Sequence, residues 1–170
     1  MTATVRTATG HDADLIARVH LATWIETYRS QLPDQFFGEA ALEHRRRMWT
    51  WMLGEGASPT QRIAVAERDG EIVGFASSGP PLDDTDRATG ASTQLYTLYV
   101  LAAHHGTGVG QRLLDAVIDP DASVVLWVAK RNPRAQSFYR RNRFRFDGVV
   151  KPDERVPSFL EARMVRKISE

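Results

Sequence analysis

The chain has 170 residues, of which 42% are hydrophobic and 25% charged, and its formal net charge is +1. This length favours one globular domain over residues 1–170, and the near-zero charge gives no reason to expect nucleic acid or a membrane as a partner. The absence of cysteine excludes a disulfide framework, a cysteine-ligated zinc site and a catalytic thiol. Because the N-terminus lacks the apolar core of a signal peptide and no apolar run could span a bilayer, we expect a soluble, cytoplasmic protein.

The N-terminal part of the chain indicates a strand followed by two helices. Residues 5–8 have the pattern of a short strand, and Thr9 and Asp12 have the spacing of a capping box in front of a helix. Residues 32–34, Leu-Pro-Asp, end this helix and begin a second one, which is rich in apolar and aromatic residues up to Met52.

The middle of the chain changes to the period of strands. Strands are expected over 63–67 and 72–76, because they flank Asp69-Gly70, a strong hairpin signal. The polar residues 79–92, rich in glycine, proline and aspartate, predict a mobile loop.

The C-terminal half alternates strands and helices. The expected elements are strand 95–101, a glycine-rich turn with a helix to about 118, strand 124–128, a short helix opened by Asn132-Pro133, and strands 144–149 and 160–165. A strand–helix–strand unit is parallel and right-handed, whereas the flanking hairpins are antiparallel. The sequence therefore predicts an α+β fold with a mixed, mostly antiparallel sheet, a central parallel pair and about four helices.

The most specific segment leads from a buried strand at Leu98 through three alternating glycines, Gly106, Gly108 and Gly110, into an amphipathic helix. Glycines let backbone amides approach a ligand closely, and the start of a helix favours an anion such as a diphosphate. The alternative is a glycine-rich turn without a ligand. No Lys-Ser/Thr follows the glycines and they come late in the chain, so the segment is neither a Walker P-loop nor a dinucleotide fingerprint.

Residues 105–110, His-Gly-Thr-Gly-Val-Gly, resemble the acetyl-CoA-binding motif of the GNAT N-acetyltransferase superfamily, (Gln/Arg)-x-x-Gly-x-(Gly/Ala). In register, His105 stands at the Gln/Arg position, while Gly108 and Gly110 stand at the last two conserved positions of the motif. The histidine is a departure that bears on the side-chain contact to the diphosphate but not on the backbone cradle.

Residues 132–139 are similar to the second cofactor segment of the family, Asn-x-x-Ala-x-x-Phe-Tyr, with matches at Asn132, Ala135, Phe138 and Tyr139. The Leu-Gly-Phe turn that usually follows is replaced by Asn142-Arg143-Phe144. Residues 24–33 are similar to the first helix pair of many bacterial members, so the resemblance covers nearly the whole chain.

The resemblance implies the GNAT fold, in which the two central parallel strands splay apart and the pantetheine arm of acetyl-CoA pairs with one of them. The implied cofactor contacts are Leu98, Tyr99, Val100, His105, Gly106, Thr107, Gly108, Val109, Gly110, Asn132, Ala135 and Phe138. For Asn132, a plain helix N-cap is the alternative and is compatible with the contact. Acetyl-CoA is the expected co-substrate, and no metal is expected.

The implied reaction is transfer of the acetyl group to a primary amine of a small molecule or peptide, by direct attack in a ternary complex. Tyr139 is the candidate acid that protonates the leaving sulfur, and its alternative is a core residue with the hydroxyl at the surface. Many members have a glutamate where this chain has Gln94, whose amide cannot act as a base but can position water or substrate. Glu26, His20 and Asp83 or Asp84 stay open as bases, as does bulk water.

The acceptor is expected near Trp24, Glu26 and Tyr28, although aromatic residues at helical spacing, including Phe36 and Phe37, more often form core. The acidic residues of the 79–92 loop, Asp83, Asp84 and Asp86, would suit a cationic acceptor, but a solvated loop is favoured. The sequence leaves the oligomeric state open, a homodimer included.

A second class of function stays open beside the enzyme. Gln94, His105 and Arg143 depart from the pattern of the family, so an acyl-CoA-binding module without catalysis, acting as a sensor or partner subunit, is the alternative.

Overall fold

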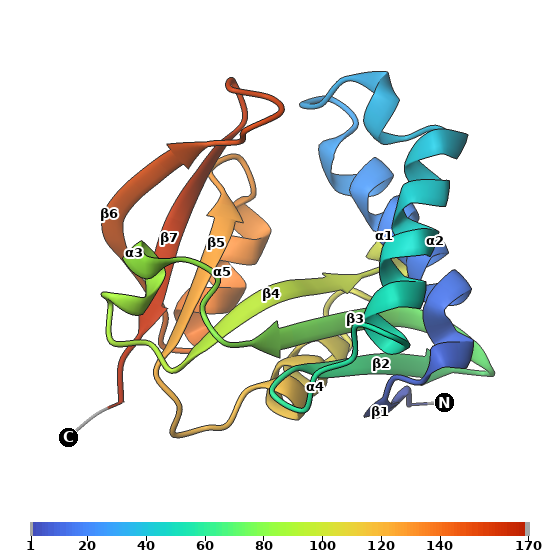
Figure 1. The fold of residues 1–170 in the computed structure, drawn as a ribbon, viewed down its shortest axis with the longest axis horizontal. Coiled ribbons are helices and arrows are strands. Elements are labelled where there is room, and N and C mark those ends of the chain that lie inside the picture. Colours follow the sequence, from blue (N-terminus) through green and yellow to red (C-terminus); the bar gives the residue numbers. More distant parts are fainter. Residues whose placement is uncertain (1, 169–170) are drawn as a thin grey trace. The chain divides into compact units, whose positions relative to one another are not determined.

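Seven strands and five α-helices are present in the computed structural model, which describes residues 2–168 (Figure 1). The strands are β1 (Thr4–Thr7), β2 (Arg62–Arg68), β3 (Glu71–Gly79), β4 (Thr93–Val100), β5 (Val124–Ala129), β6 (Arg145–Pro152) and β7 (Leu160–Arg166). The helices are α1 (Ala13–Tyr28), α2 (Glu39–Leu53), α3 (Asp84–Arg87), α4 (Val109–Val117) and α5 (Pro133–Arg141). Short 3₁₀ turns lie at Gly10–Asp12, Asp34–Phe36 and Ala102–His104. Within the described residues, no helix combines the length and the apolar character needed to cross a membrane.

The strands form a mixed sheet in the order β1-β2-β3-β4-β5-β7-β6. Strands β4 and β5 are parallel, and the pairs β1–β2, β2–β3, β5–β7 and β6–β7 are antiparallel. The parallel register joins only residues 93–95 to residues 124–126, whereas β4 continues to Val100. The predicted α+β fold with a central splayed parallel pair is thus confirmed, with α3 as the helix that the sequence did not indicate.

The chain divides into two compact units, one of residues 1–78 and 97–117 and the other of residues 79–96 and 118–170. One GNAT domain over residues 1–170 stays a prediction.

The first unit is built on the hairpin of β2 and β3. The turn has Asp69 and Gly70 at φ values of 53° and 83°, the left-handed pair that a two-residue hairpin turn requires. Helices α1 and α2 pack on one face of the hairpin (Figure 1). The core between them contains Ile16, Trp49 and Phe75. This packing explains why polar helix faces and apolar ones alternate with the helical period in the sequence.

The start of α1 confirms the predicted capping box. The Thr9 amide donates to a carboxylate oxygen of Asp12 at 2.7 Å, and the Asp12 amide donates to the Thr9 carbonyl at 2.9 Å. Both guanidinium ends of Arg6 also donate to this carboxylate, at 2.8 and 2.9 Å, and they hold the pKa of Asp12 down at about 2. The buried Asp12 carboxylate is stable because Arg6 and Thr9 donate hydrogen bonds to it and compensate for its loss of solvent.

The second unit holds the segment for which the sequence indicated a mobile loop. Helix α3 lies within it, and the Asp83 side chain caps this helix by accepting from the Asp86 amide at 2.8 Å. The Asp86 side chain is only 1% exposed and accepts from Arg163 at 3.2 Å and from the indole of Trp127 at 3.0 Å. The expectation of an irregular loop is therefore wrong for residues 84–87, which form α3. The expectation of a solvated acidic cluster is wrong for Asp86, because β5 and β7 supply donors to its buried carboxylate, whereas Asp83 and Asp84 are exposed.

The buried ion pair gives a prediction on stability. Replacing Asp86 by asparagine leaves the Arg163 guanidinium with a single carboxylate partner, Asp147 at 2.7 Å. Breaking a buried pair typically costs about 3–5 kcal/mol, and we expect the lower end because Asp147 remains. The measurement is urea denaturation of the Asp86→Asn variant.

Asp84→Asn is the matched control, because the Asp84 carboxylate is 97% exposed and its pair with Arg87 should be worth less than about 1 kcal/mol. Equal losses in the two variants would contradict a structural role for the buried pair.

Candidate functional site

The glycine turn of the first unit has the backbone expected of an anion cradle. Gly106 and Gly108 have φ values of +76° and +83°, and no atom lies within 4 Å of the position that a Cβ would take at either residue. Helix α4 follows at once from Val109, and the first amide groups of a helix have no acceptor within it. Successive N–H groups in alternating right- and left-handed conformations form a concave site for anions. The residues present therefore fit the diphosphate of acetyl-CoA.

His105 connects this turn to the end of β4. Its Nε2 lies 2.8 Å from the Val100 carbonyl oxygen, and Nε2 must donate because a carbonyl oxygen only accepts. The Thr107 hydroxyl donates to the His104 carbonyl at 2.7 Å and closes the same turn. The histidine thus serves the shape of the turn, and only its Nδ1 atom remains for another partner.

The backbone N–H and C=O groups of successive residues of β4 point alternately toward β3 and away from it. The Leu101 amide donates to the Val73 carbonyl at 3.0 Å, and a Cβ at Gly74 would meet the Tyr99 carbonyl at 2.8 Å, so residues 99 and 101 face β3. Because the backbone groups of successive strand residues point to opposite sides, Leu98 and Val100 direct theirs away from β3. The backbone groups of Leu98 and the amide of Val100 are therefore not used by β3, whereas the Val100 carbonyl accepts from His105. Gly74 of β3 is required because the Tyr99 carbonyl of β4 approaches it closely.

Three residues that the sequence suggested for substrate or base have partners within the first unit. A carboxylate oxygen of Glu26 accepts from the Ala102 amide at 2.9 Å and so holds the start of the 3₁₀ turn after β4. Tyr28 is buried, as are Phe36 and Phe37, in line with the core alternative. Trp24 packs edge-on against Tyr28 and carries the Arg45 guanidinium 4.8 Å above its ring.

His20 is a structural residue and not a base. It lies among the rings of Trp24, Trp49, Phe75 and Tyr99, at centroid distances of 5.4–6.1 Å. Its Nδ1 accepts from the Trp49 indole at 3.1 Å, so the neutral ring carries its proton on Nε2. Burial, together with the charge of Arg45, lowers the pKa of His20 to about 3, and such a ring binds protons too weakly for base catalysis.

Gln94 in the second unit is 7% exposed, and its side-chain oxygen accepts from the Leu82 amide at 2.9 Å. The amide therefore holds the segment before α3 on the sheet. This contact gives Gln94 a positioning role that the sequence could not indicate, because the partner lies 12 residues away in a segment without periodicity.

Helix α5 matches its prediction in detail. The Asn132 side chain accepts from the Ala135 amide at 3.1 Å, and Pro133 stands at the first helical position. Tyr139 is 8% exposed, and its ring lies between those of Phe138 and Phe144 at 5.4 and 5.7 Å. The N-cap alternative for Asn132 is confirmed, and a cofactor contact of the same side chain stays a prediction.

In the turn after α5, an arginine takes the backbone conformation that glycine usually adopts. Arg143, at the position where the family has glycine, has a φ of 69°, and the Phe144 amide donates to the Tyr139 carbonyl at 3.0 Å. A left-handed residue at this place is the usual end of a helix, and a side chain there costs about 1–2 kcal/mol. The Arg143 guanidinium donates to the Pro120 carbonyl at 3.0 Å, a contact that a glycine could not make.

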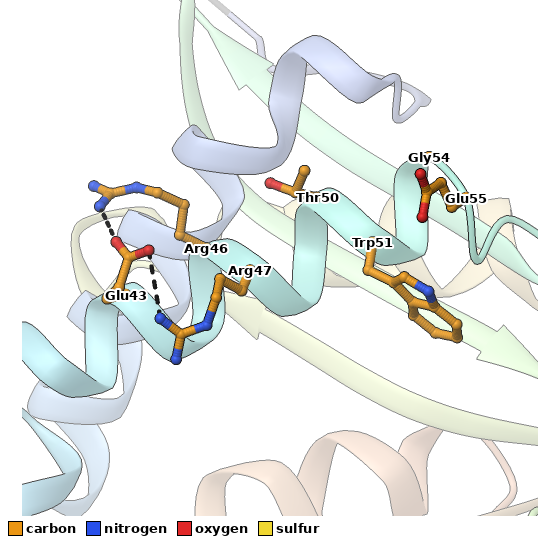
Figure 2. Close-up of a pocket in the computed structure, with 7 residues that line it drawn as sticks. All are labelled: Glu43, Arg46, Arg47, Thr50, Trp51, Gly54 and Glu55. Carbon is orange, nitrogen blue, oxygen red and sulfur yellow. Dashed lines mark hydrogen bonds and ion pairs between the residues drawn. The ribbon is translucent and has the colours of Figure 1, made fainter.

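An open depression on α2 contains none of the predicted site residues (Figure 2). It is lined by Glu43, Arg46, Arg47, Thr50, Trp51, Gly54 and Glu55. Glu43 pairs with Arg46 at 2.7 Å and with Arg47 at 3.5 Å, as Figure 2 shows, and Trp51 is 60% exposed. Glu43, Arg46 and Arg47 are neighbours at helical spacing, so the depression is formed by the exposed side chains along one face of α2 and the residues that follow it.

One structural side chain escaped the sequence reasoning, Arg163 of β7, which pairs with Asp86 and Asp147. The available signal was the alternation of charged and apolar residues in a closing strand. Among residues 2–168, no group of three or more histidine, aspartate or glutamate side chains could hold a metal ion, and independence from metals stays a prediction.

The family model and the curated relatives that match this chain are all acetyltransferases by name. The acetyltransferase (GNAT) family model matches residues 21–144. Probable N-acetyltransferase Rv2775 of Mycobacterium tuberculosis is 34% identical over 86 residues, which are 49% of this chain and 47% of that protein, so the chain spans about half of its length. Uncharacterized N-acetyltransferase YuaI of Bacillus subtilis is 27% identical over 135 residues, which cover 76% of this chain and 73% of that protein.

Two solved structures share the fold. The PaiA N-acetyltransferase of Thermoplasma acidophilum, in complex with coenzyme A, has a TM-score of 0.70 at 17% identity, with coverage of 98% of this chain and 99% of that chain. The yncA structure from Salmonella typhimurium, with its cofactor acetyl-CoA, has a TM-score of 0.69 at 19% identity, with coverage of 100% and 96%.

The buried imidazole predicts a pH dependence of stability. The pKa of His20 is about 3 in the folded protein and about 6.5 when unfolded, so the unfolded chain binds one more proton between these values. The free energy of unfolding should therefore fall as the pH is lowered below 6.5, by about 2 kcal/mol from this group at pH 5.

The measurement compares denaturant unfolding between pH 7 and pH 5 for the wild type and His20→Phe. The variant should lose less stability over this range, and His11→Asn, which changes an exposed histidine, should keep the wild-type slope. Identical slopes for the wild type and His20→Phe would contradict the neutral, buried ring.

Proposed function

The chain belongs to the acetyltransferase (GNAT) family, and from this premise we propose that it transfers an acetyl group from acetyl-CoA to a primary amine of a small molecule or peptide. The observation that carries the proposal is the glycine turn, where two open, left-handed glycines precede the amide groups of a helix start. Structures of the same fold hold coenzyme A or acetyl-CoA, which supports the same co-substrate here. We place the reaction in the cytoplasm and expect it to need no metal.

In this proposal the backbone amides of residues 106–110 bind the diphosphate, and the polar backbone groups of Leu98 and Val100 pair with the pantetheine arm. In the second unit, Asn132, Ala135 and Phe138 are the proposed contacts, on the resemblance of residues 132–139 to the second cofactor segment of the family. A backbone cradle needs no particular side chain, which is why histidine at position 105 is compatible with binding.

Acetyl-CoA supplies the activated acetyl thioester when bound. The chain must then orient the amine, stabilise the oxyanion and protonate the departing sulfur. Tyr139 is the proposed acid, because a phenol is neutral at physiological pH and its ring is held by Phe138 and Phe144. Gln94 acts by holding the segment before α3, because its amide oxygen accepts from the Leu82 amide, and a side-chain amide is not basic enough to act as a base.

For the acceptor, we propose a contact with Trp24, whose indole nitrogen is buried without a partner among the described residues. An unsatisfied donor of this kind costs about 1–3 kcal/mol, which favours a polar ligand atom nearby. Glu26 and Tyr28 then shape this surface through the Ala102 amide and the core, respectively.

One observation favours a second candidate, an acyl-CoA-binding module without catalysis. All three side chains that depart from the pattern of the family, Gln94, His105 and Arg143, bond to backbone of their own unit. A chain that keeps the backbone cradle while its side chains serve structure would bind the co-substrate and not turn it over.

The cradle is tested by Gly108→Asp. The substitution places a negative charge beside the proposed diphosphate site, and like charges in contact cost several kcal/mol, so the affinity for CoA should fall at least about a hundredfold. Calorimetric titration with CoA measures the effect. Gly70→Asp is the matched control, because Gly70 has the same φ of +83° and the same open surroundings in the hairpin turn. Affinity that is equal in the two variants would remove the glycine turn from binding.

The acid is tested by Tyr139→Phe, which deletes one hydroxyl and keeps the ring. Loss of general acid catalysis should lower kcat by about a hundredfold or more, with little change in KM, because the proton moves only in the transition state. Release of CoA can be followed with a thiol reagent, since the chain has no cysteine of its own.

Tyr96→Phe serves as the control for hydroxyl loss, because Tyr96 donates to the Pro80 carbonyl and has no proposed catalytic role. Wild-type kcat in Tyr139→Phe would take this residue out of the chemistry. A wild type that binds acetyl-CoA but releases no CoA with any amine would favour the binding module.

A further inference from the structure

One of the four indole nitrogens of the chain is buried without a hydrogen-bond partner. It is the Nε1 atom of Trp24 on α1, to which no acceptor among residues 2–168 is bonded. Trp49 and Trp127, by contrast, donate to side chains at 3.1 and 3.0 Å, and Trp51 is 60% exposed to solvent. Because a buried donor without an acceptor destabilises the fold, Trp24 is the indole at which a ligand atom would supply what the protein does not.

The side chains in contact with the Trp24 ring include a cation and no anion. His20 and Tyr28 pack edge-on against it at centroid distances of 5.8 and 5.4 Å, and the Arg45 guanidinium lies 4.8 Å from the ring centre. The nearest carboxylate along the helix is that of Glu26. Residues two apart on a helix point to different sides, and the Glu26 carboxylate is bonded to the turn after β4.

Arg45 gives this place a fixed positive charge. The residue is 7% exposed, and its Nη1 donates to the carbonyls of Phe36 and Ala41 at 3.3 and 3.1 Å. Backbone carbonyls carry no net charge, so these bonds orient the guanidinium and leave its charge in place. The charge also acts on His20, where it adds to the effect of burial in lowering the pKa. An anion at the Trp24 nitrogen would therefore lie in a positive field.

His20 supplies a second donor beside Trp24, one turn earlier on α1. Its Nδ1 accepts from Trp49, so the neutral ring carries its proton on Nε2. This N–H donates to no atom of residues 2–168, and it is not one of the unpartnered atoms that are cut off from solvent. Two neighbouring N–H groups and a cation form a set of donors, which suits an anionic acceptor group.

The donor set of Trp24, His20 and Arg45 lies beside the strand that is proposed to hold the pantetheine arm. The His20 ring stacks on that of Tyr99 in β4 at a centroid distance of 5.4 Å. Tyr99 stands between Leu98 and Val100, whose backbone groups are the proposed partners of the arm. All of these residues belong to the first unit. A ligand at the donor set and an arm along β4 would thus be held by one compact unit.

We propose that Trp24 and Arg45 bind a carboxylate of the acceptor, so that the substrate is a small molecule with both a primary amine and a carboxylate. The inference rests on the proposed function and names the substrate class of that reaction. The indole N–H donates a charge-assisted hydrogen bond to the carboxylate, and the His20 Nε2–H donates a second one. Arg45 adds an attraction that a neutral acceptor does not receive, and it repels a polyamine.

The experiment uses two pairs of acceptors that differ in the carboxylate: glycylglycine with glycylglycine amide, and L-phenylalanine with 2-phenylethylamine. CoA release is measured for the wild type, Trp24→Phe and Trp51→Phe. The wild type should have a KM at least about tenfold lower for the carboxylate of each pair, the usual worth of a hydrogen bond to a charged group. Trp24→Phe deletes the N–H and keeps an aromatic ring, so it should raise the KM for the carboxylates about tenfold or more.

The same variant should leave kcat and the KM for the two neutral amines nearly unchanged, because a structural defect would affect both members of a pair alike. Trp51→Phe removes the exposed indole of α2 and should behave as the wild type. The preferences of the wild type test the inference by themselves if Trp24→Phe does not fold.

The indole N–H signals in proton–nitrogen correlation spectra provide a readout without turnover. Phenylacetate, a carboxylate without an amine, should shift the Trp24 signal of the wild type, whereas phenylacetamide should not. The two variants assign the Trp24 and Trp51 signals by their absence.

Equal KM values within each pair for the wild type would overturn the inference and leave the transferase intact. Equal losses for both members in Trp24→Phe, with no response of its signal to phenylacetate, would show a structural indole and also overturn it. Faster turnover of spermidine than of all four probes would show a site for cations, with the same consequence. A wild type that binds acetyl-CoA and acetylates no amine would overturn the proposed function and this inference together.

Discussion

The candidate site depends on the two-sided backbone of β4. Residues 99 and 101 direct their polar groups to β3, and the close approach at Gly74 keeps the strands together. Leu98 and Val100 then carry backbone groups that β3 does not use, directly before the turn of Gly106 and Gly108. A strand with one edge bonded and the other available is a natural partner for an extended ligand. The proposed contact with the pantetheine arm depends on this division of hydrogen bonds.

Buried polar groups decide which candidate residues serve structure and which remain for chemistry. His20 accepts from Trp49, and Asp86 is neutralised by Arg163 and Trp127. Each of these side chains looked available along the sequence, because its partner comes from a distant element. Half-buried Glu161, by contrast, has no such partner among the described residues.

The departures from the family pattern have physical explanations. His105 donates to the Val100 carbonyl and stabilises the turn that it precedes. Arg143 takes the left-handed conformation that glycine normally supplies and gains a contact to Pro120. At position 94 the chain has glutamine where many members of the family have glutamate. The neutral side chain accepts from the Leu82 amide, and no carboxylate has to be buried near the core.

The sequence by itself determined the elements that have a local cause. The hairpin at Asp69-Gly70, the capping box at Thr9 and the cap at Asn132 depend on neighbouring residues, and all three are present in the structure. Only the tertiary structure decided the states of Asp86 and His20, because packing brings together residues that are far apart in the chain. Local spacing records turns and caps, whereas the cost of burying a charge depends on donors that the fold alone brings near.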